Sequence, residues 1–156
     1  MELIFISMLK IDEKDLLILD ILKKNAKLQT SRISKITKIP ITTVHNRIKK
    51  LKKLGVIKKY TIDIDFEKIG KPILAYLLVT ALSYSEFKEK PLTQNEVAEI
   101  IKKSLPIEEI NVITGVYDFM IKVRTKNIEE LSNLVLALRK LRGVSKTQTT
   151  ISLYNL

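Results

Sequence analysis

Polar side chains recur on one face of residues 41–54, a segment whose apolar residues are spaced as in an amphipathic helix. The apolar stripe consists of Val44, Ile48 and Leu51. With about 100° of rotation per residue, the opposite face carries Thr42, Asn46, Lys49 and Lys53, flanked by Thr43, His45 and Lys50. Asn can form two hydrogen bonds to adenine, Thr can contact a thymine methyl group, and Lys holds phosphate without reading sequence. We therefore expect this face to enter the major groove of duplex DNA.

Several of these side chains also have an ordinary structural interpretation. Asn46 is equally compatible with a solvated helix position, and His45 suits a phosphate or solvent contact better than base reading. Arg47 lies about 60° from the apolar stripe, so it can either contact DNA or stabilise the fold by pairing with an acid of an earlier helix. Lys58 and Lys59 follow the helix and are placed to reach flanking phosphates. We count all five residues named here among the candidate DNA contacts.

The positive charge of the chain is concentrated around this helix. Between Leu22 and Ile62 there are thirteen basic residues and no acidic residue, whereas the rest of the chain has 15 basic and 17 acidic residues. Such a concentrated field attracts a polyanion. The alternative, a solvated lysine-rich surface, is less favoured because such surfaces usually intersperse acids. The charge distribution therefore indicates a nucleic-acid partner.

Composition excludes several other classes of protein. The chain has 156 residues, 46% of them hydrophobic, which suits one large domain or two small ones. It has no cysteine and only one histidine, so disulfides, Cys or His metal sites and a metal cofactor are not expected. No apolar run is long enough to cross a bilayer, and residues 1–8 lack the features of a signal peptide. We expect a cytoplasmic protein without a cofactor.

The first third of the chain reads as three helices followed by a hairpin strand. Asp12 is a suitable N-cap for a helix over residues 13–24, and Thr30 for a helix over residues 31–37. Gly55 is placed to end the helix that covers residues 41–54. Residues 56–64 alternate apolar and polar side chains, which is typical of a strand or wing. We expect a DNA-binding domain over residues 1–64, in which residues 1–8 are an extension.

The remaining residues read as an α/β sandwich after a linker at residues 65–70. Strands are expected at residues 72–82, 107–114, 119–124 and 144–153, and a loop at residues 83–92. Thr93 can cap a helix that runs to about residue 104, and Asn127 or Thr125 starts a helix that runs to about residue 141. This strand–helix–strand–strand–helix–strand order is the ferredoxin-like βαββαβ fold of an α+β protein, here spanning residues 71–156. The strands carry apolar residues on both faces, and two helices cover only one face. We therefore expect a second copy of the chain to cover the other.

Short strings along the chain carry a family resemblance. They are Ile11-Asp12-Glu13-Lys14-Asp15 with Ile18-Leu19, Asn25-Ala26-Lys27, Thr42-Thr43-Val44 with Arg47 and Leu51, Gly55-Val56-Ile57 with Tyr60, Gly70, and Thr114-Gly115-Val116-Tyr117-Asp118. Each string is weak alone, but their order and spacing are specific. From about residue 9 to residue 153, the chain resembles the leucine-responsive regulatory protein / AsnC family of prokaryotic transcription regulators. It departs from the usual family pattern at Lys38, where Gly is common, at Pro40, where Ser often caps the helix, and at Lys52, which replaces an acid.

The resemblance implies a winged helix-turn-helix joined to a ligand-regulated ferredoxin-like domain. It further implies homodimers formed through the sheets, often assembled into octamers, and an amino-acid effector bound between subunits. Carried over, Gly115 and Asp118 are the effector-site candidates, since Gly115 permits close backbone approach and Asp118 can hold an ammonium group. The alternative is a tight turn in which Asp118 bonds local amides.

Two other functions remain open at this point. A non-specific architectural DNA-binding protein would share the basic stretch but not the base-reading side chains. An enzyme similar to sirohaem decarboxylases would share the two-domain scaffold. No acid–base set gathers in the second half of the sequence, and the only histidine lies on the basic helix. We therefore expect a regulator rather than an enzyme.

Overall fold

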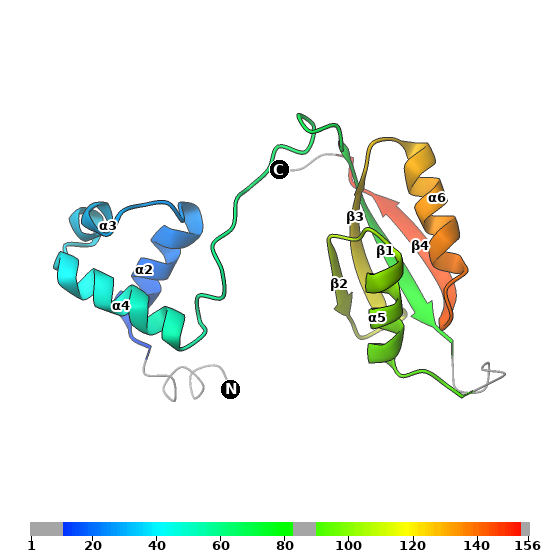
Figure 1. Cartoon of the computed structure of the whole chain (residues 1–156), viewed down its shortest axis with the longest axis horizontal. Coiled ribbons are helices and arrows are strands. Elements are labelled where there is room, and N and C mark those ends of the chain that lie inside the picture. Colours follow the sequence, from blue (N-terminus) through cyan, green and yellow to red (C-terminus); the bar gives the residue numbers. More distant parts are fainter. Residues whose placement is uncertain (1–10, 83–89, 154–156) are drawn as a thin grey trace. The chain divides into compact units, whose positions relative to one another are not determined.

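The computed structural model describes residues 11–82 and 90–153, and it divides the chain into two compact units (Figure 1). The first unit covers residues 1–63 and the second covers residues 64–156. The extension predicted at residues 1–8 lies outside the described residues, as does most of the loop predicted at 83–92.

The first unit begins with helix α2, Glu13–Lys24, whose bounds agree with the prediction. Asp12 is its N-cap, and its carboxylate accepts a hydrogen bond from the Asp15 amide while the Asp15 carboxylate accepts one from the Asp12 amide. This reciprocal capping box satisfies two backbone donors that a helix start otherwise leaves free. It also holds two carboxylates side by side at the N-terminus of α2.

Helices α3, Thr30–Thr37, and α4, Ile41–Lys53, complete the three-helix unit. The prediction that Thr30 caps α3 was wrong, because Gln29 occupies the cap position and makes no side-chain bond there. Between the helices, Lys38 adopts a left-handed conformation with φ of 59°. The turn is held by the Ser34 hydroxyl, which donates to the Ile39 carbonyl at 2.6 Å. This bond helps the chain tolerate a lysine where glycine would be less strained.

A small apolar core joins these helices. Its buried members are Ile18, Leu22, Ile33, Ile39 and Val44, and Ile48 and Ile57 pack against them. Val44 and Leu51 are fully buried, which confirms the predicted apolar stripe of α4. The opposite face of α4 is therefore turned away from this core.

The strand predicted within residues 56–64 does not form, so this segment is an extended stretch without strand pairing. Gly55, with φ of 71°, reverses the chain after α4, and the amides of Val56 and Ile57 both donate to the Leu51 carbonyl. An alternating pattern becomes a strand only beside a second extended segment. The described residues of the first unit offer none, so residues 58–65 run without ladder pairing.

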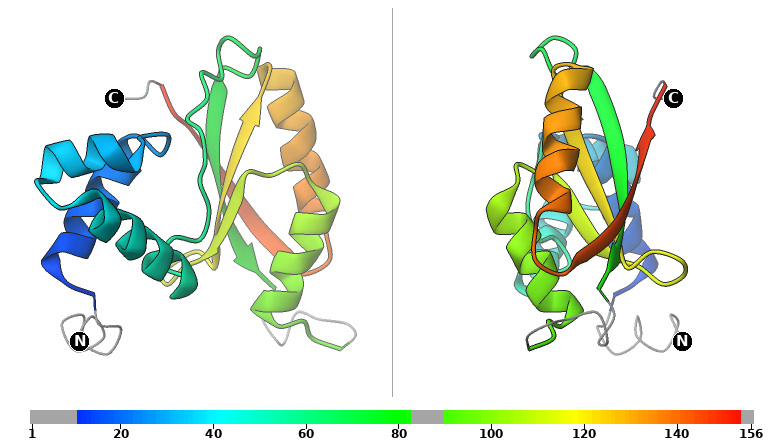
Figure 2. Two further views of the ribbon diagram at one scale, coloured as in Figure 1. Left: turned by 60° about the vertical axis from the view of Figure 1, so that its left-hand side comes forward. Right: turned by 90° about the vertical axis from the view of Figure 1, so that its right-hand side faces the viewer.

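The second unit contains the predicted βαββαβ order. Its elements are β1 Ile73–Ala81, α5 Gln94–Ser104, β2 Glu109–Val112, β3 Phe119–Thr125, α6 Ile128–Arg139 and β4 Val144–Ile151. The four strands form one antiparallel sheet in the order β2-β3-β1-β4. Helices α5 and α6 cover one face of this sheet, and the main apolar core lies between the two layers (Figure 2).

Local signals account for the helix starts of this unit. Thr93 caps α5, as the sequence predicted, and it forms a reciprocal capping box with Glu96. For α6 the sequence left Thr125 and Asn127 open, and the structure selects Asn127, whose side chain accepts from the Glu130 amide at 2.8 Å. The strand predicted over residues 107–114 is shorter than expected, because pairing with β3 stops at Val112.

The other face of the sheet has no helix over it among the described residues. Leu74, Tyr76 and Leu78 project from β1 onto this face, opposite Arg124, Lys122 and Met120 of β3.

Residues 66–70, predicted as linker, form a turn in which the Lys71 amide donates to the Phe66 carbonyl at 2.8 Å. The Phe66 ring lies 3.9 Å from the Arg124 guanidinium. This contact attaches the turn to the sheet.

Candidate nucleic-acid interface

The outward face of α4 is exposed as predicted. Thr42, His45, Asn46, Lys49 and Lys53 are all exposed, and Thr43 is half-buried. The helix contains no acidic residue, and its last turn is basic. Cations near a helix C-terminus complement the negative end of the helix dipole. This face therefore presents hydroxyl and amide groups together with cations, and no acid of the helix opposes an approaching phosphate.

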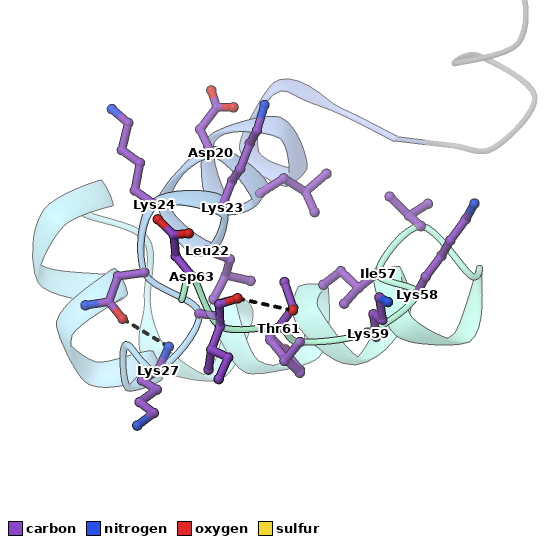
Figure 3. Close-up of a pocket in the computed structure, with 16 residues that line it drawn as sticks. Asp20, Leu22, Lys23, Lys24, Lys27, Ile57, Lys58, Lys59, Thr61 and Asp63 are labelled. Atoms are coloured by element: carbon purple, nitrogen blue, oxygen red, sulfur yellow. Dashed lines mark hydrogen bonds between the residues drawn. The ribbon is translucent and has the colours of Figure 1, made fainter. Parts of the chain in front are cut away.

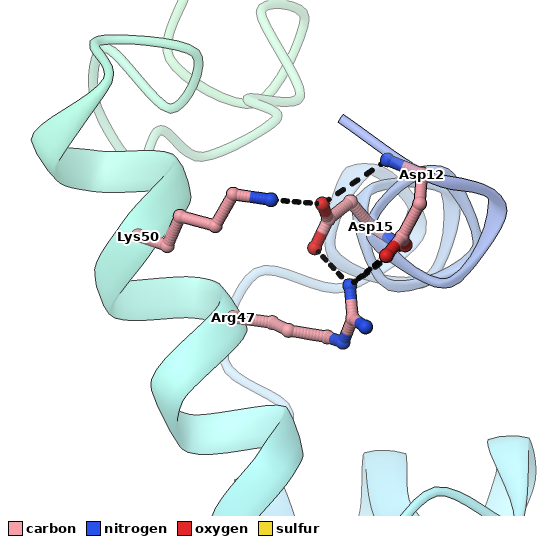
Figure 4. Close-up of polar contacts among 4 residues, drawn as sticks. All are labelled: Asp12, Asp15, Arg47 and Lys50. Carbon is pink, nitrogen blue, oxygen red and sulfur yellow. Dashed lines mark hydrogen bonds and ion pairs between the residues drawn. The ribbon is translucent and has the colours of Figure 1, made fainter. Parts of the chain in front are cut away.

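Arg47 and Lys50 lie on a different face of α4, directed towards the N-terminus of α2 (Figure 4). Arg47 Nη1 donates to both carboxylate oxygens of Asp12 at 2.7 Å and to Asp15 Oδ1 at 2.8 Å. Lys50 Nζ donates to Asp15 Oδ2 at 2.7 Å. The Asp15 side chain is fully buried, whereas the Asp12 side chain is about half exposed. We call these four residues the acid–base cluster. Of the two alternatives for Arg47, pairing with an acid of the first helix is confirmed.

The cluster keeps both carboxylates charged. Burial raises the pKa of Asp15, but hydrogen bonds from Lys50 and Arg47 outweigh burial and hold that pKa below its usual range. The Arg47 hydrogen bond likewise lowers the pKa of Asp12. The same bonds raise the pKa of Arg47. At neutral pH the cluster therefore contains two anions and two cations, and it adds no net charge to the basic unit.

A shallow hollow of about 330 Å³ lies beside the cluster, lined by Asp12, Thr43, Asn46, Arg47 and Lys50. It brings two predicted base-reading residues, Thr43 and Asn46, next to the cations that α2 holds. The polar groups of α4 are thus not independent of α2. Sequence spacing predicted the two faces of α4 but could not identify Asp12 and Asp15 as the partners of Arg47 and Lys50.

Lys58 and Lys59 lie elsewhere, at an open groove of about 920 Å³ between the second half of α2 and residues 56–63 (Figure 3). Lys23, Lys24 and Lys27 of the α2 end line the same groove. The structure therefore groups Lys58 and Lys59 with cations of α2 and not with the hollow on α4.

The sequence did not predict the contact of Lys52, whose ammonium lies 4.7 Å from the centre of the Tyr60 ring. Residue spacing gives no signal for this contact, which depends on how the chain turns after Gly55.

In the second unit, Gly115 and Asp118 lie in the connection between β2 and β3. Gly115 has φ of 125° and open space where a Cβ would stand. The Asp118 carboxylate accepts from the Ala81 amide at 2.8 Å and from Gln94 Nε2 at 2.9 Å, and the Asp118 amide donates to Val79. Asp118 thus ties the end of β1 to the start of α5. Gln94, its side-chain partner, was not predicted, and no sequence signal marks it.

The first unit has three helices, and a turn presents the third as an exposed helix without acidic residues. Amide, hydroxyl and ammonium groups lie on its outward face. This arrangement defines a helix-turn-helix DNA-binding protein. In the described residues no helix is long and apolar enough to cross a membrane. Nor do three His, Cys, Asp or Glu side chains gather there in a group able to hold a metal ion.

Comparison with known proteins identifies the family. The family model for winged helix-turn-helix DNA-binding matches residues 11–58, and that for the Lrp/AsnC ligand binding domain matches residues 84–156. The HTH-type transcriptional regulator FL11 of Pyrococcus horikoshii is 41% identical over 143 residues, covering 92% of this chain and 89% of its own. The chain therefore belongs to the Lrp/AsnC family of DNA-binding transcription regulators.

Solved structures share the fold of the whole chain. Escherichia coli AsnC matches with a TM-score of 0.78 and 23% identity, covering 93% of each chain. The feast or famine regulatory protein from M. tuberculosis, complexed with L-methionine, matches with a TM-score of 0.80 and 21% identity, covering 92% of each chain. The predicted α+β fold, a winged helix-turn-helix unit with a ferredoxin-like unit, is confirmed at the level of the family.

Proposed function

We propose that this regulator recognises specific duplex DNA sites through the outward face of α4. Thr42, Thr43 and Asn46 would contact base edges, while Lys49 and Lys53 would contact phosphates beside His45. The observation that carries the proposal is the exposure of Asn46 on a helix whose outward face is entirely free of acids. Lys58 and Lys59 would contact the backbone beyond the groove that they line. Protein of this kind would act in the cytoplasm, where the chromosome lies.

Selection of bound fragments from random duplex DNA at physiological salt tests this proposal. The protein should enrich a defined motif, and Asn46→Ala should relax base preference at one position of it. A good pair of hydrogen bonds to a base is worth about 1–3 kcal/mol of discrimination. Lys53→Ala is the matched control on the same face, since loss of a phosphate contact weakens all sequences about equally. If no motif is enriched, the protein is a packaging protein rather than a site-specific regulator.

The second unit is proposed to join copies of the chain. Residues 71–156 would form this oligomerisation and effector domain, residues 65–70 the linker, and residues 1–64 the DNA-binding domain. Support comes from the sheet face that has no helix over it among the described residues, where Tyr76 and Leu78 of β1 are only half-buried, since exposed apolar faces in small proteins are usually covered. A dimer would bring two copies of α4 to half-sites about 34 Å apart. Light scattering of wild type and Tyr76→Glu distinguishes a monomer, a dimer and an octamer.

An amino acid is the proposed effector, with Gly115 and Asp118 at its site. The relative complexed with L-methionine supports this class of ligand. A carboxylate can accept about four hydrogen bonds, so Asp118 could receive a ligand ammonium in addition to Ala81 and Gln94. Thermal melts with each of the common amino acids test the proposal. A ligand that stabilises wild type but not Asp118→Asn would support it, and no stabilisation by any amino acid would contradict it.

A further inference from the structure

We infer that the acid–base cluster is the device that orients α4 on DNA, so that Arg47 is a positioning residue and not a phosphate contact. The inference rests on the proposed DNA recognition by α4, and it concerns how the outward face of this helix is oriented towards DNA. Two carboxylates at the start of α2 hold two cations in the middle of α4, although the residues are 32–35 positions apart in sequence. This network links the two helices directly (Figure 4).

Ionic hydrogen bonds can fix an orientation that apolar packing leaves loose. Burial of Val44 and Leu51 favours one side of α4, but apolar contact is non-directional. Arg47 and Lys50 are three positions apart and therefore lie on one side of α4. With both held by Asp15, the helix can neither rotate about its axis nor slide along α2 without breaking a bond of 2.7–2.8 Å. The cluster thus fixes both the rotation of α4 about its own axis and its position along α2.

Base-reading side chains lie directly beside this network. Asn46 precedes Arg47 in the helix, and Thr43 and Asn46 line the hollow that the cluster borders. A turn of one residue about the helix axis would swing Asn46 by about 100° and take its amide away from a base edge. The orientation of the Asn46 side chain therefore depends on the bonds that Asp12 and Asp15 make.

The charge balance of the cluster gives a second, independent consequence. Arg47 and Lys50 count among the thirteen basic residues of the stretch, yet their charges are matched by Asp12 and Asp15. The Arg47 side chain is only 20% exposed. Arg47 should therefore release few counterions from DNA. Lys49, its exposed neighbour, should behave as an ordinary phosphate contact, for which loss lowers the slope of log affinity against log salt by about one unit.

The test compares Arg47→Met, Arg47→Lys and the matched control Lys49→Met. Each full-length variant is titrated with a duplex selected by wild type and with a scrambled duplex, at several salt concentrations. Arg47→Met should reduce the preference for the selected duplex tenfold or more while the salt slope on the scrambled duplex stays within half a unit of wild type. Arg47→Lys keeps the charge, but its side chain ends one atom short of Nη1, the atom that makes the bonds to Asp12 and Asp15. It should therefore lose much of the preference too. Lys49→Met should lower the slope by about one unit and leave the preference almost unchanged.

Circular dichroism and thermal melts establish that each variant is folded at the assay temperature. Should Arg47→Met unfold, Asp12→Asn replaces it, because that change weakens the exposed end of the cluster and keeps an oxygen that can cap α2. Its preference should fall in the same way. A drop of about one unit in slope for Arg47→Met, or full preference in Arg47→Lys, would overturn the inference. If wild type itself shows no preference for the selected duplex, the proposed function fails instead.

Discussion

Asp15 is a fully buried carboxylate, and its charge is matched by Arg47 and Lys50 of another helix. A hydrogen bond to a charged group typically contributes about 1.5–3 kcal/mol, and Asp15 makes such bonds to both cations while Arg47 keeps Asp12 as a second partner. Asp15→Ala should therefore lower the free energy of unfolding of the first unit by about that amount. Chemical denaturation followed by circular dichroism measures the loss.

Asp12→Ala is the matched comparison for Asp15, since both residues take part in the same capping box and bind Arg47. Asp12 is half exposed, so its replacement should cost about 1 kcal/mol, the usual value of a lost helix cap. Equal losses in the two variants would contradict the view that burial makes Asp15 the central residue of the cluster.

Among the helices and strands of the second unit, the turn at Gly143 is constrained by both its backbone conformation and its packing. Its φ is 91°, and a Cβ there would stand 2.5 Å from Val97 Cγ2 in α5. Gly143→Ala should destabilise the second unit through two effects, a left-handed alanine at about 1–2 kcal/mol and overpacking at about 1–3 kcal/mol. Gly70→Ala, with φ of 73° and open space, should show only the first effect. Thermal melts that rank the two variants equally would contradict this packing.

Sequence predicted those elements that local signals determine. The capping boxes at Asp12 and Thr93 mark helix starts with neighbouring residues alone, so α2 and α5 begin where expected. The apolar strings of β1 and β3 predicted buried strands for a similar reason. The strand predicted within residues 56–64 was wrong because a strand needs a pairing partner, which an alternating pattern does not reveal. The cap predicted at Thr30 was wrong because a residue type that often caps helices does not always form a capping bond.

The candidate site was predictable only in part for the same physical reason. Helical periodicity separates the face of Asn46 from the face of Val44, since it needs only the angle per residue. The placement of Arg47 depends on α2 coming to lie against α4, a tertiary contact between distant residues. Periodicity left both of its roles open. Similarly, the bonds of Asp118 to Ala81 and Gln94 arise from the sheet and α5 together, which residue spacing does not encode.

Across the whole molecule, acid should destabilise the DNA-binding unit through the acid–base cluster. The pKa values of Asp12 and Asp15 are both held below the ordinary value of about 3.9. Their ionised forms therefore stabilise the fold above that value, and the contribution disappears as pH falls below it towards the lowered pKa values. The melting temperature should be nearly constant from pH 7 to about pH 5 and decline below about pH 4.

Asp15→Asn provides the control for the acid prediction. The variant lacks the buried titrating group, so it should start from a lower melting temperature at pH 7 and lose less of it on acidification. Circular dichroism melts of both proteins at each pH measure the difference. An equal decline in the two proteins would assign the acid sensitivity to groups outside the acid–base cluster.

In the proposed function, the acid-free face of α4 binds the phosphates and bases of duplex DNA. The affinity of the wild-type protein for a selected duplex, measured from about 50 to 200 mM salt, tests this proposal. We predict a steep linear fall of log affinity with log salt, because each neutralised phosphate contributes about one unit of slope. Lys49→Ala should make that slope shallower by about one unit. Affinity that does not depend on salt in either protein would contradict the account.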